Sequence, residues 1–365
     1  MYDAIIVGAR CAGSPTGMLL AQAGLKVLVV DRDTFPSDVL STHFLQPDAM
    51  VRLEKWGIRQ RLIDAGTPQA TTMMLNALGA SFPAPPGEFL PMAPRRTVLD
   101  TALVNAAREA GAEVREGFSV QEITRDASGA VTGIVGRDAT GNAVTEQARV
   151  VIGADGRNSF VARQVNAEEY NAHEATSCGF YAYLKDTRTD IMEITLADEV
   201  FAFYFSTNGG GCVGIETAMS HWDEIRADPG GYVAGVLREK APTIAAHIQG
   251  AEVDGRWLGM QGRRSFFRKP YGPGWALVGD AGYLKDPICG TGIDDALRDA
   301  ELLSAALIAG FRGEKPLDEA LAAYQEARDK SQSVRYPIIC ELAELGPMTP
   351  ERLGKFAMQA VPVPA

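Results

Sequence analysis

The chain has 365 residues, of which 46% are hydrophobic and 22% charged, a composition typical of a globular protein with room for two domains. Its net charge of −11 argues against binding to nucleic acid or to anionic lipid surfaces. The five cysteines are widely spaced and only four histidines occur, so we expect neither a disulfide framework nor a metal site. No apolar run reaches the ~20 residues of a membrane span. The first residues read as a strand and not as a secretory signal, and we therefore expect a cytoplasmic protein.

The N-terminal residues predict a β-α-β unit. An apolar run at 3–7 ends at Gly8, a helix is expected over 14–24, and a β-branched strand follows over 25–31 and ends in Asp31. Strand, glycine turn, helix, strand and acid in this order are typical of a dinucleotide-binding fold.

The middle of the chain has a different character. Aromatic and β-branched runs between residues 177 and 218, such as FAFYFS at 201–206, alternate with period two and predict an antiparallel sheet. Helices are expected over 47–57, 97–110, 229–249, 293–310 and 317–330, and strands over 112–120, 131–155, 256–267 and 275–281. Pieces of one α/β domain therefore bracket a mostly β insertion.

The first motif is the turn G8-A-R-C-A-G13. In a G-x-G-x-x-G turn, the middle glycine admits the pyrophosphate and the last lets helix and strand pack closely. Arg10 replaces the middle glycine, so its side chain must either point away from the phosphates or bind them. Asp31 ends the second strand, where a carboxylate can accept hydrogen bonds from ribose hydroxyls. For this motif alone, a glycine-rich turn without a ligand remains the alternative.

Two further motifs follow buried strands. The segment V151-I-G-A-D-G-R-N-S159 places Asp155 after a strand, although an Asp-Gly pair can also be a plain turn. The segment 275–293 places Asp280 after a strand and then a glycine-bearing loop, 287–292, that opens a helix near Ile293. A helix N-terminus at this point favours negative charge.

In this order, and with the segment R96-T-V-L-D100, these motifs resemble the FAD-binding motifs of the flavoprotein monooxygenases related to para-hydroxybenzoate hydroxylase. The sequences of these motifs most resemble those of a bacterial branch that also contains flavin halogenases and geranylgeranyl-type reductases. The resemblance implies a Rossmann-like FAD-binding domain and an inserted, mostly antiparallel β-sheet domain for the substrate. The implied boundaries are 1–75, 95–175 and 265–330 for the FAD domain, 76–94 and 176–264 for the substrate domain, and 331–365 for a C-terminal helical tail.

The resemblance also assigns residues. The cofactor-binding set that it implies is Gly8, Arg10, Gly13, Asp31, Arg32, Arg96, Asp155, Asp280, Gly290, Thr291, Gly292 and Ile293. The first five and Asp155 serve the adenosine–pyrophosphate part, Arg96 and Asp280 the ribityl–pyrophosphate region, and the last four the isoalloxazine, together with Pro287. Pro287 and His43 are the catalytic candidates. His43 lies on the segment that approaches the flavin and would contact substrate or nicotinamide, with a structural hydrogen-bonding role as the alternative.

Some positions depart from the family pattern or have two interpretations. Tyr283 stands where many hydroxylases have histidine, which puts a proton role there in doubt. For Cys289, the role of a small packing residue is preferred over that of a reactive thiol or of a covalent link to the flavin. Lys285 and Asp286 could orient a substrate, but an exposed ion pair is the preferred interpretation. Four aromatic residues of the sheet could line the substrate cavity or simply form its core: Tyr181, Tyr183, Phe203 and Phe205.

The implied reaction is reduction of FAD by NAD(P)H, formation of a flavin C4a-hydroperoxide with O₂, and hydroxylation of an aromatic or polyketide-like small molecule. An FAD-dependent reductase or dehydrogenase that moves hydride without oxygen is the main alternative, and a non-catalytic flavin-binding protein is the weakest. The W-x-W-x-I-P segment of halogenases is absent, which argues against halogenation. A separate flavin reductase is an alternative electron donor, and both a monomer and a homodimer fit the sequence.

Overall fold

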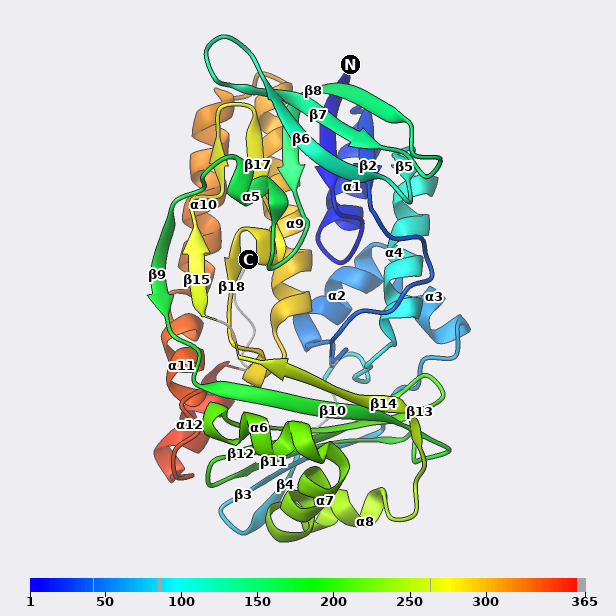
Figure 1. Ribbon diagram of the computed structural model, residues 1–365, viewed down its shortest axis with the longest axis vertical. Coiled ribbons are helices and arrows are strands. Elements are labelled where there is room, and N and C mark those ends of the chain that lie inside the picture. Colours follow the sequence, from blue (N-terminus) through cyan, green and yellow to red (C-terminus); the bar gives the residue numbers. More distant parts are fainter. Residues whose placement is uncertain (42, 85–86, 263, 360–365) are drawn as a thin grey trace.

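The computed structural model describes residues 1–41, 43–84, 87–262 and 264–359. Within these residues the chain forms an eight-stranded, a seven-stranded and a three-stranded sheet. The eight-stranded sheet and its helices occupy one end of the elongated molecule, and the seven-stranded sheet lies at the other end (Figure 1). The predicted fold class, an α/β domain with an inserted and mostly antiparallel sheet, is confirmed.

The eight-stranded sheet is built around β1, which is apolar from Ala4 to Val7 and pairs in parallel with β2 on one side and β8 on the other. The main order is β16-β17-β8-β1-β2-β5, and β6 and β7 extend from β8 as antiparallel strands. Its strands are β1 (Tyr2–Val7), β2 (Val27–Val30), β5 (Glu113–Arg115), β6 (Ser119–Arg125), β7 (Val131–Arg137), β8 (Ala143–Gly153), β16 (Tyr271–Gly272) and β17 (Trp275–Leu277).

Helices cover one face of this sheet, where they share a hydrophobic core that includes Ile6, Val29 and Leu297. They are α1 (Gly13–Gln22), α2 (Pro47–Lys55), α3 (Arg59–Asp64), α4 (Arg96–Glu109), α9 (Gly292–Phe311) and α10 (Leu317–Gln332). A second core on the opposite face includes Ile5, Phe118 and the short helix α5 (Phe160–Gln164). The central strands β1 and β2 are therefore nearly continuous apolar runs because both of their faces are buried.

The seven-stranded sheet has the order β14-β10-β13-β12-β11-β3-β4 and is antiparallel except where β11 pairs with β3. Its strands are β3 (Thr72–Ala77), β4 (Ala80–Ala84), β10 (Ser177–Lys185), β11 (Ile191–Ala197), β12 (Val200–Thr207), β13 (Gly210–Ala218) and β14 (Val253–Gln261). The expected alternation along β12 is confirmed, since Phe201, Phe203 and Phe205 enter one core and Tyr204 enters another.

Each face of the seven-stranded sheet has its own cover. One face packs on η1 (Met219–His221), α6 (Trp222–Ala227), α7 (Pro229–Lys240) and α8 (Pro242–His247). The face with the phenylalanines packs on the C-terminal helices α11 (Arg335–Leu342) and α12 (Pro350–Gln359) and on the loop at 288–289. The sheet thus meets the eight-stranded half of the molecule through its aromatic face.

A three-stranded sheet lies beside these two. It consists of β9 (Glu169–His173), β15 (Ser265–Arg268) and β18 (Tyr283–Leu284), in the order β18-β15-β9. Phe267 stacks between Tyr170 and Tyr283, which fixes the chain that leads to the loop after residue 285. Of the helices in the described part of the chain, none is long and apolar enough to cross a membrane.

Candidate FAD-binding and active site

The turn between β1 and α1 requires glycine at both of its ends. Gly8 has a φ of +105°, and a Cβ there would lie 2.4 Å from the Ala154 carbonyl oxygen. A Cβ on Gly13 would lie 1.8 Å from the carbonyl oxygen of Gly8. Both glycines therefore bring the N-terminus of α1 against the end of β1, as predicted. No side chain among the described residues caps α1, although the N–H of Ser14 donates to the Arg10 carbonyl and Pro15 has no N–H. The N–H of Gly13 and the helix dipole therefore suit an anion.

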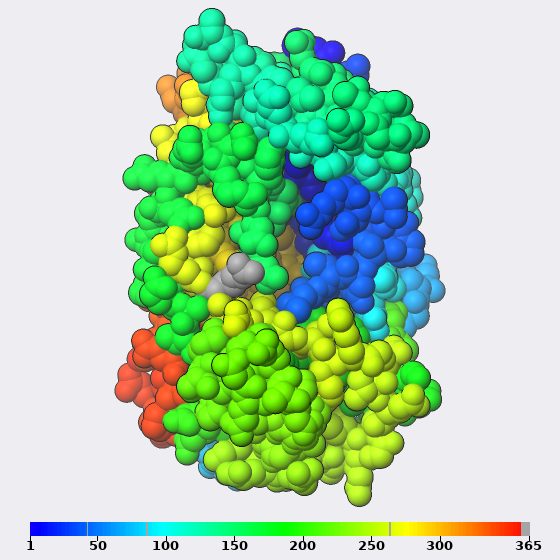
Figure 2. Space-filling view, in the orientation of Figure 1, coloured from blue at the N-terminus to red at the C-terminus, as the bar shows by residue number. Residues whose placement is uncertain are grey.

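Figure 2 shows a hollow on this face of the molecule. Blue atoms of the early chain border it on one side and green and yellow atoms on the other, and dark blue atoms of the N-terminal segment are visible inside it. The β1–α1 turn belongs to that dark blue segment. An elongated group could therefore reach the turn from this side.

Arg10 points into the protein. Its Nη1 lies 2.5 Å from Asp100 Oδ2, and its Nη2 lies 2.8 Å from both Asp33 Oδ2 and Ser37 Oγ. Asp100 is fully buried and also accepts hydrogen bonds from Arg96, which starts α4. Of the two orientations left open by the sequence, Arg10 therefore takes one in which carboxylates hold its guanidinium.

The acid at the end of β2 holds the glycine turn in place. Asp31 Oδ2 accepts a hydrogen bond of 2.7 Å from the N–H of Ala9, and its Oδ1 accepts one of 2.9 Å from the N–H of Asp33. Burial raises the pKa of Asp31, and these two hydrogen bonds oppose the rise. The side chain of the neighbouring Arg32 is 83% exposed and lies 4.0 Å from Asp33.

Asp155, in the second motif, caps a helix. Its Oδ1 accepts a 2.5 Å hydrogen bond from Ser159, and its Oδ2 accepts the N–H groups of Phe160 and Val161 at the start of α5. Burial raises the pKa of Asp155, and these hydrogen bonds oppose the rise without cancelling it. Asp155 also lies next to the first motif, because its Cα is 3.1 Å from where a Cβ on Gly8 would be.

The third motif packs directly on the first. Gly279 has a φ of +61°, and a Cβ there would lie 2.8 Å from the Cβ of Ala12 in the α1 turn. Asp280 follows in the 3-10 turn η2 (Gly279–Ala281). Burial raises the pKa of Asp280 to about 6, with the charge of Arg96 acting against the rise. The turn thus places a carboxyl near α1 and α4.

The loop after residue 286 ends at a second open helix. Asp286 accepts the N–H of Ile288 and so caps the 3-10 turn η3 (Pro287–Cys289), and Gly290 is left-handed with a φ of +60°. Helix α9 begins at Gly292, and no side chain in the described part of the chain caps it. A Cβ on Gly292 would meet no described atom within 4 Å. Like α1, α9 therefore offers N–H groups to a negatively charged partner.

The His43 segment lies against this loop. Gln46 donates through Nε2 to the carbonyl oxygen of Cys289 at 3.0 Å, and Asp294 of α9 accepts the backbone N–H groups of Gln46 and Ala49. Burial and the neighbouring Asp295 raise the pKa of Asp294 to about 7. These contacts fix the segment on the loop predicted to line the isoalloxazine.

His43 itself is buried, with 1% of its surface exposed and a φ of +66°. Its Nε2 hydrogen-bonds the hydroxyl of Tyr183, on which its ring also stacks. Its Nδ1 has no partner among the residues that the structure describes. Burial, followed by the charges of Arg96 and Arg95, holds the pKa of His43 well below its usual range. The imidazole is therefore neutral, with one buried nitrogen left for a ligand.

The prediction that Lys285 and Asp286 form an exposed ion pair is wrong. Both side chains are buried, and Lys285 Nζ lies 2.5 Å from Asp295 Oδ2 and 2.6 Å from Gln332 Oε1. Asp286 instead lies 2.7 Å from the hydroxyl of Ser177. The local sequence is polar, but Lys285 is held by residues of α9 and α10 and Asp286 contacts β10 of the seven-stranded sheet.

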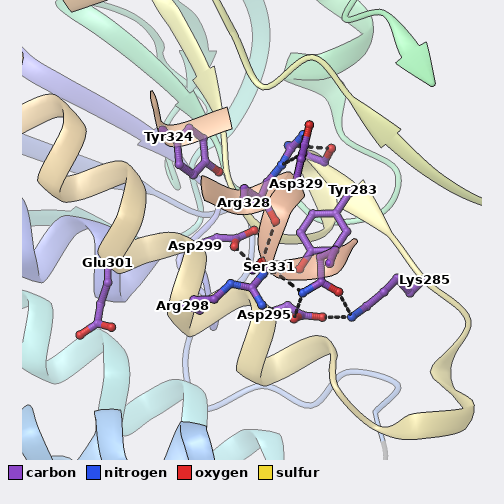
Figure 3. A network of polar contacts seen from close by, with 12 residues as sticks. Tyr283, Lys285, Asp295, Arg298, Asp299, Glu301, Tyr324, Arg328, Asp329 and Ser331 are labelled. Atoms are coloured by element: carbon purple, nitrogen blue, oxygen red, sulfur yellow. Dashed lines mark hydrogen bonds and ion pairs between the residues drawn. The ribbon is translucent and has the colours of Figure 1, made fainter. Parts of the chain in front are cut away.

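Figure 3 shows the network around Lys285. Although burial acts to raise the pKa of Asp295, Lys285 and Arg298 lower it to about 2. Arg298 also donates to the hydroxyl of Tyr283 at 2.7 Å. Tyr283 is therefore held by an arginine, and burial raises the pKa of Tyr283 well above its usual value. Burial likewise raises the pKa of the Cys289 thiol, which agrees with a packing role for that cysteine.

The predicted residues thus converge on one region. The turns of motifs one and three touch, Asp155 adjoins Gly8, and the His43 segment contacts the loop before α9. Sequence reasoning missed Asp100 and Arg95. Asp100 joins Arg10 to Arg96, and the Arg95 guanidinium lies 3.5 Å from the ring centre of Tyr183. A charged residue on the buried face of a predicted helix was the available signal for Asp100.

The chain is similar in sequence to several known proteins over most of its length. The chain is 28% identical over 349 residues to conditioned medium factor receptor 1 of Dictyostelium discoideum, covering 89% of this chain and 67% of that protein. It is 28% identical over 326 residues to menaquinone reductase of Mycolicibacterium smegmatis, covering 84% and 76%. It is 24% identical over 367 residues to rifampicin monooxygenase of Streptomyces venezuelae, covering 94% and 70%.

Among solved structures, the flavin-dependent brominase Bmp2 superposes with a TM-score of 0.84 over 98% of this chain and 90% of the brominase. The two sequences are 20% identical, so this likeness shows the fold alone. The family model described as an FAD binding domain matches residues 1–334. By that match and by the turns described above, the chain belongs to this FAD-binding family, within the superfamily of para-hydroxybenzoate hydroxylase-like flavoproteins.

Proposed function

We propose that this FAD-dependent oxidoreductase is a monooxygenase that uses NAD(P)H and O₂ to hydroxylate an aromatic or polyketide-like small molecule. One apolar cluster supports the proposed class of substrate: Tyr181, Tyr183 and Phe205 of the seven-stranded sheet pack with Ile288 and Cys289 of the loop before α9. In the family that the chain resembles, this loop lines the isoalloxazine. The aromatic face therefore offers a flat apolar substrate a surface beside the flavin.

The residues fit FAD at both ends of the region. Gly8 and Gly13 would let the pyrophosphate approach the N-terminus of α1, and Asp280 would accept hydrogen bonds from hydroxyls of the cofactor. Bound FAD would supply the redox chemistry and the activation of O₂. The remaining proposed cofactor contacts are Asp31, Arg32, Arg96, Gly290, Thr291, Gly292 and Ile293. Arg10 and Asp155, whose polar atoms are engaged by the protein, would act by shaping the turns.

His43 would be the residue that meets the substrate or the nicotinamide. If the hydroxyl of Tyr183 donates to Nε2, the single proton of the neutral ring sits on Nδ1, which then becomes a hydrogen-bond donor. Arg95 stacks on Tyr183 and would hold that orientation. Pro287 would fix the backbone of the loop on the flavin side.

The division of labour between the domains is part of the proposal. The FAD domain would comprise 1–75, 95–175 and 265–330, and the substrate domain 76–94 and 176–264. Strand β3 (Thr72–Ala77) crosses the first boundary and pairs with β11 of the seven-stranded sheet. The tail, 331–365, includes α11 and α12, which pack on the aromatic face of that sheet.

A reductase that moves hydride without oxygen is the second candidate. The 28% identity to a menaquinone reductase over 84% of this chain favours it. Quinones are also flat and apolar, so the aromatic face does not discriminate between the two candidates. The reactivity of the reduced flavin with O₂ does.

The test begins with FAD-loaded protein that is reduced anaerobically and then mixed rapidly with O₂. A monooxygenase should show a transient absorbing species before the oxidised flavin spectrum returns. If O₂ restores the oxidised flavin spectrum in a single step, and menadione reoxidises the flavin rapidly without O₂, the reductase replaces the monooxygenase as the proposed function. His43→Gln should alter the decay of the transient, whereas His173→Gln, an exposed histidine of β9, should leave it unchanged.

A further inference from the structure

A buried polar cluster connects the seven-stranded sheet to the loop before α9. The hydroxyl of Ser177, the first residue of β10, lies 2.7 Å from Glu216 Oε1 and 2.7 Å from Asp286 Oδ2. Ser177, Glu216 and Asp286 are 1%, 5% and 6% exposed. Glu216 belongs to β13 of the sheet, and Asp286 directly precedes Pro287.

The number of hydrogens in this cluster restricts its protonation. A serine hydroxyl carries one proton, so it can donate to only one of two carboxyl oxygens at hydrogen-bond distance. The other carboxyl must donate to the serine oxygen and must therefore be protonated. Burial first, and then the charge of Asp286, raise the pKa of Glu216 well above its usual range. Glu216 is thus the protonated member, and it donates to Ser177, which donates to the Asp286 carboxylate.

The cluster continues into the backbone of the loop. The second oxygen of Asp286, Oδ1, accepts the N–H of Ile288 at 3.1 Å and so caps the turn at Pro287–Cys289. If Glu216 lost its proton, two buried carboxylates would share one hydroxyl proton and would repel each other. Asp286 would then move, and its cap on the turn would weaken.

We propose that Glu216, Ser177 and Asp286 form a proton-sharing bridge that sets the position of the loop Pro287–Gly290 against the flavin. Glu216 is then a positioning residue, since it acts through Asp286 and not on a reacting atom. The proposal rests on the proposed placement of FAD beside this loop. Three thiols interact electrostatically with members of the bridge: Cys178 of β10, Cys289 of the loop and Cys340 of α11. Lys285 and Arg335 lie in the same surroundings and act on the Cys289 thiol.

Two readouts on Glu216→Gln separate the bridge from the proposed function. The amide stays neutral and can donate to Ser177, so it mimics protonated Glu216 at every pH. The first readout is the visible absorbance and fluorescence of bound FAD as a function of pH. The wild-type holoenzyme should show a transition above the usual titration range of glutamate, and this transition should be lost in Glu216→Gln. The matched control is Glu193→Gln, another buried glutamate of the sheet that faces His247, and it should keep the transition.

Asp286→Asn provides a second variant. It removes the negative charge that opposes ionisation of Glu216 but keeps an oxygen that can cap Ile288. The transition should therefore move to lower pH. A transition that stays in place in both Glu216→Gln and Asp286→Asn would overturn the proposal.

The second readout, thermal stability, needs no flavin. A group whose pKa is raised in the folded state stabilises the fold below its unfolded pKa, and this stabilisation is lost as the pH rises through the folded value. The Tm of Glu216→Gln relative to that of wild type should therefore increase as the pH rises. If the chain takes up no FAD, the proposed function fails, and the Tm readout still tests the bridge. Parallel Tm profiles of wild type and variant would refute the bridge.

Discussion

Replacing Arg10 with glycine would restore the glycine that dinucleotide-binding turns usually have, yet the structure predicts damage. Arg10 holds Asp100 Oδ2 at 2.5 Å, and Asp100 is 0% exposed. Losing a charge-assisted hydrogen bond to a buried carboxylate costs about 2–3 kcal/mol. The pair with Asp33, which is 41% exposed, adds about 0.5 kcal/mol after screening. The flexibility of glycine adds about 0.5–1 kcal/mol. We therefore expect Arg10→Gly to lower the free energy of unfolding by about 3–4.5 kcal/mol.

The assay is urea unfolding of the FAD-free protein at pH 7, together with FAD titration. In the unfolding assay, Arg32→Gly is the control for the added glycine because the side chain of Arg32 is 83% exposed, and its unfolding midpoint should fall by no more than the flexibility of glycine accounts for. Combining Arg10→Gly with Asp100→Asn should cost less than the sum of the single changes, because both remove the same pair. An Arg10→Gly variant that is as stable as wild type and binds FAD more tightly would refute the reasoning.

Three further changes have defined outcomes. FAD affinity should weaken as the pH falls below about 6, since protonation of Asp280, whose pKa burial raises to about 6, removes an acceptor; Asp280→Asn should show a flat, weaker titration. Gly13→Ala should lose flavin on gel filtration, because its Cβ would lie 1.8 Å from a carbonyl oxygen, whereas Gly354→Ala in α12 should not. Arg328→Met should lower the free energy of unfolding by about 3–5 kcal/mol in urea, because Arg328 is fully buried and donates to the carbonyl of Gly282.

The features that sequence predicted are those with a local physical cause. The β1–α1 turn needs glycines at Gly8 and Gly13, and these stand out in any pattern. The alternation along 201–206 was predicted correctly, because alternation in a strand is a property of neighbouring residues. The start of α9 was also predicted within one residue, since a glycine-bearing loop precedes a long apolar repeat.

The features that sequence could not predict depend on distant partners. Lys285 and Asp286 look like surface residues in the sequence because their partners are distant. Asp295, which pairs with Lys285, lies in α9, and Ser177, which contacts Asp286, lies in β10. The partner of Arg10 is 90 residues away in α4. The contacts of Ser177 with Glu216 and Asp286 likewise join the seven-stranded sheet to the loop before α9, and no local pattern encodes this contact.

The most direct test of the account is the flavin content of the folded chain. Apoprotein shown to be folded by circular dichroism should be titrated with FAD and followed by flavin fluorescence and absorbance. We predict saturation at one FAD per chain and clearly weaker binding in Asp280→Ala, while His173→Ala should match wild type. A folded protein that takes up no FAD, or that binds it equally well without Asp280, would contradict the placement of the cofactor between the two open helix N-termini.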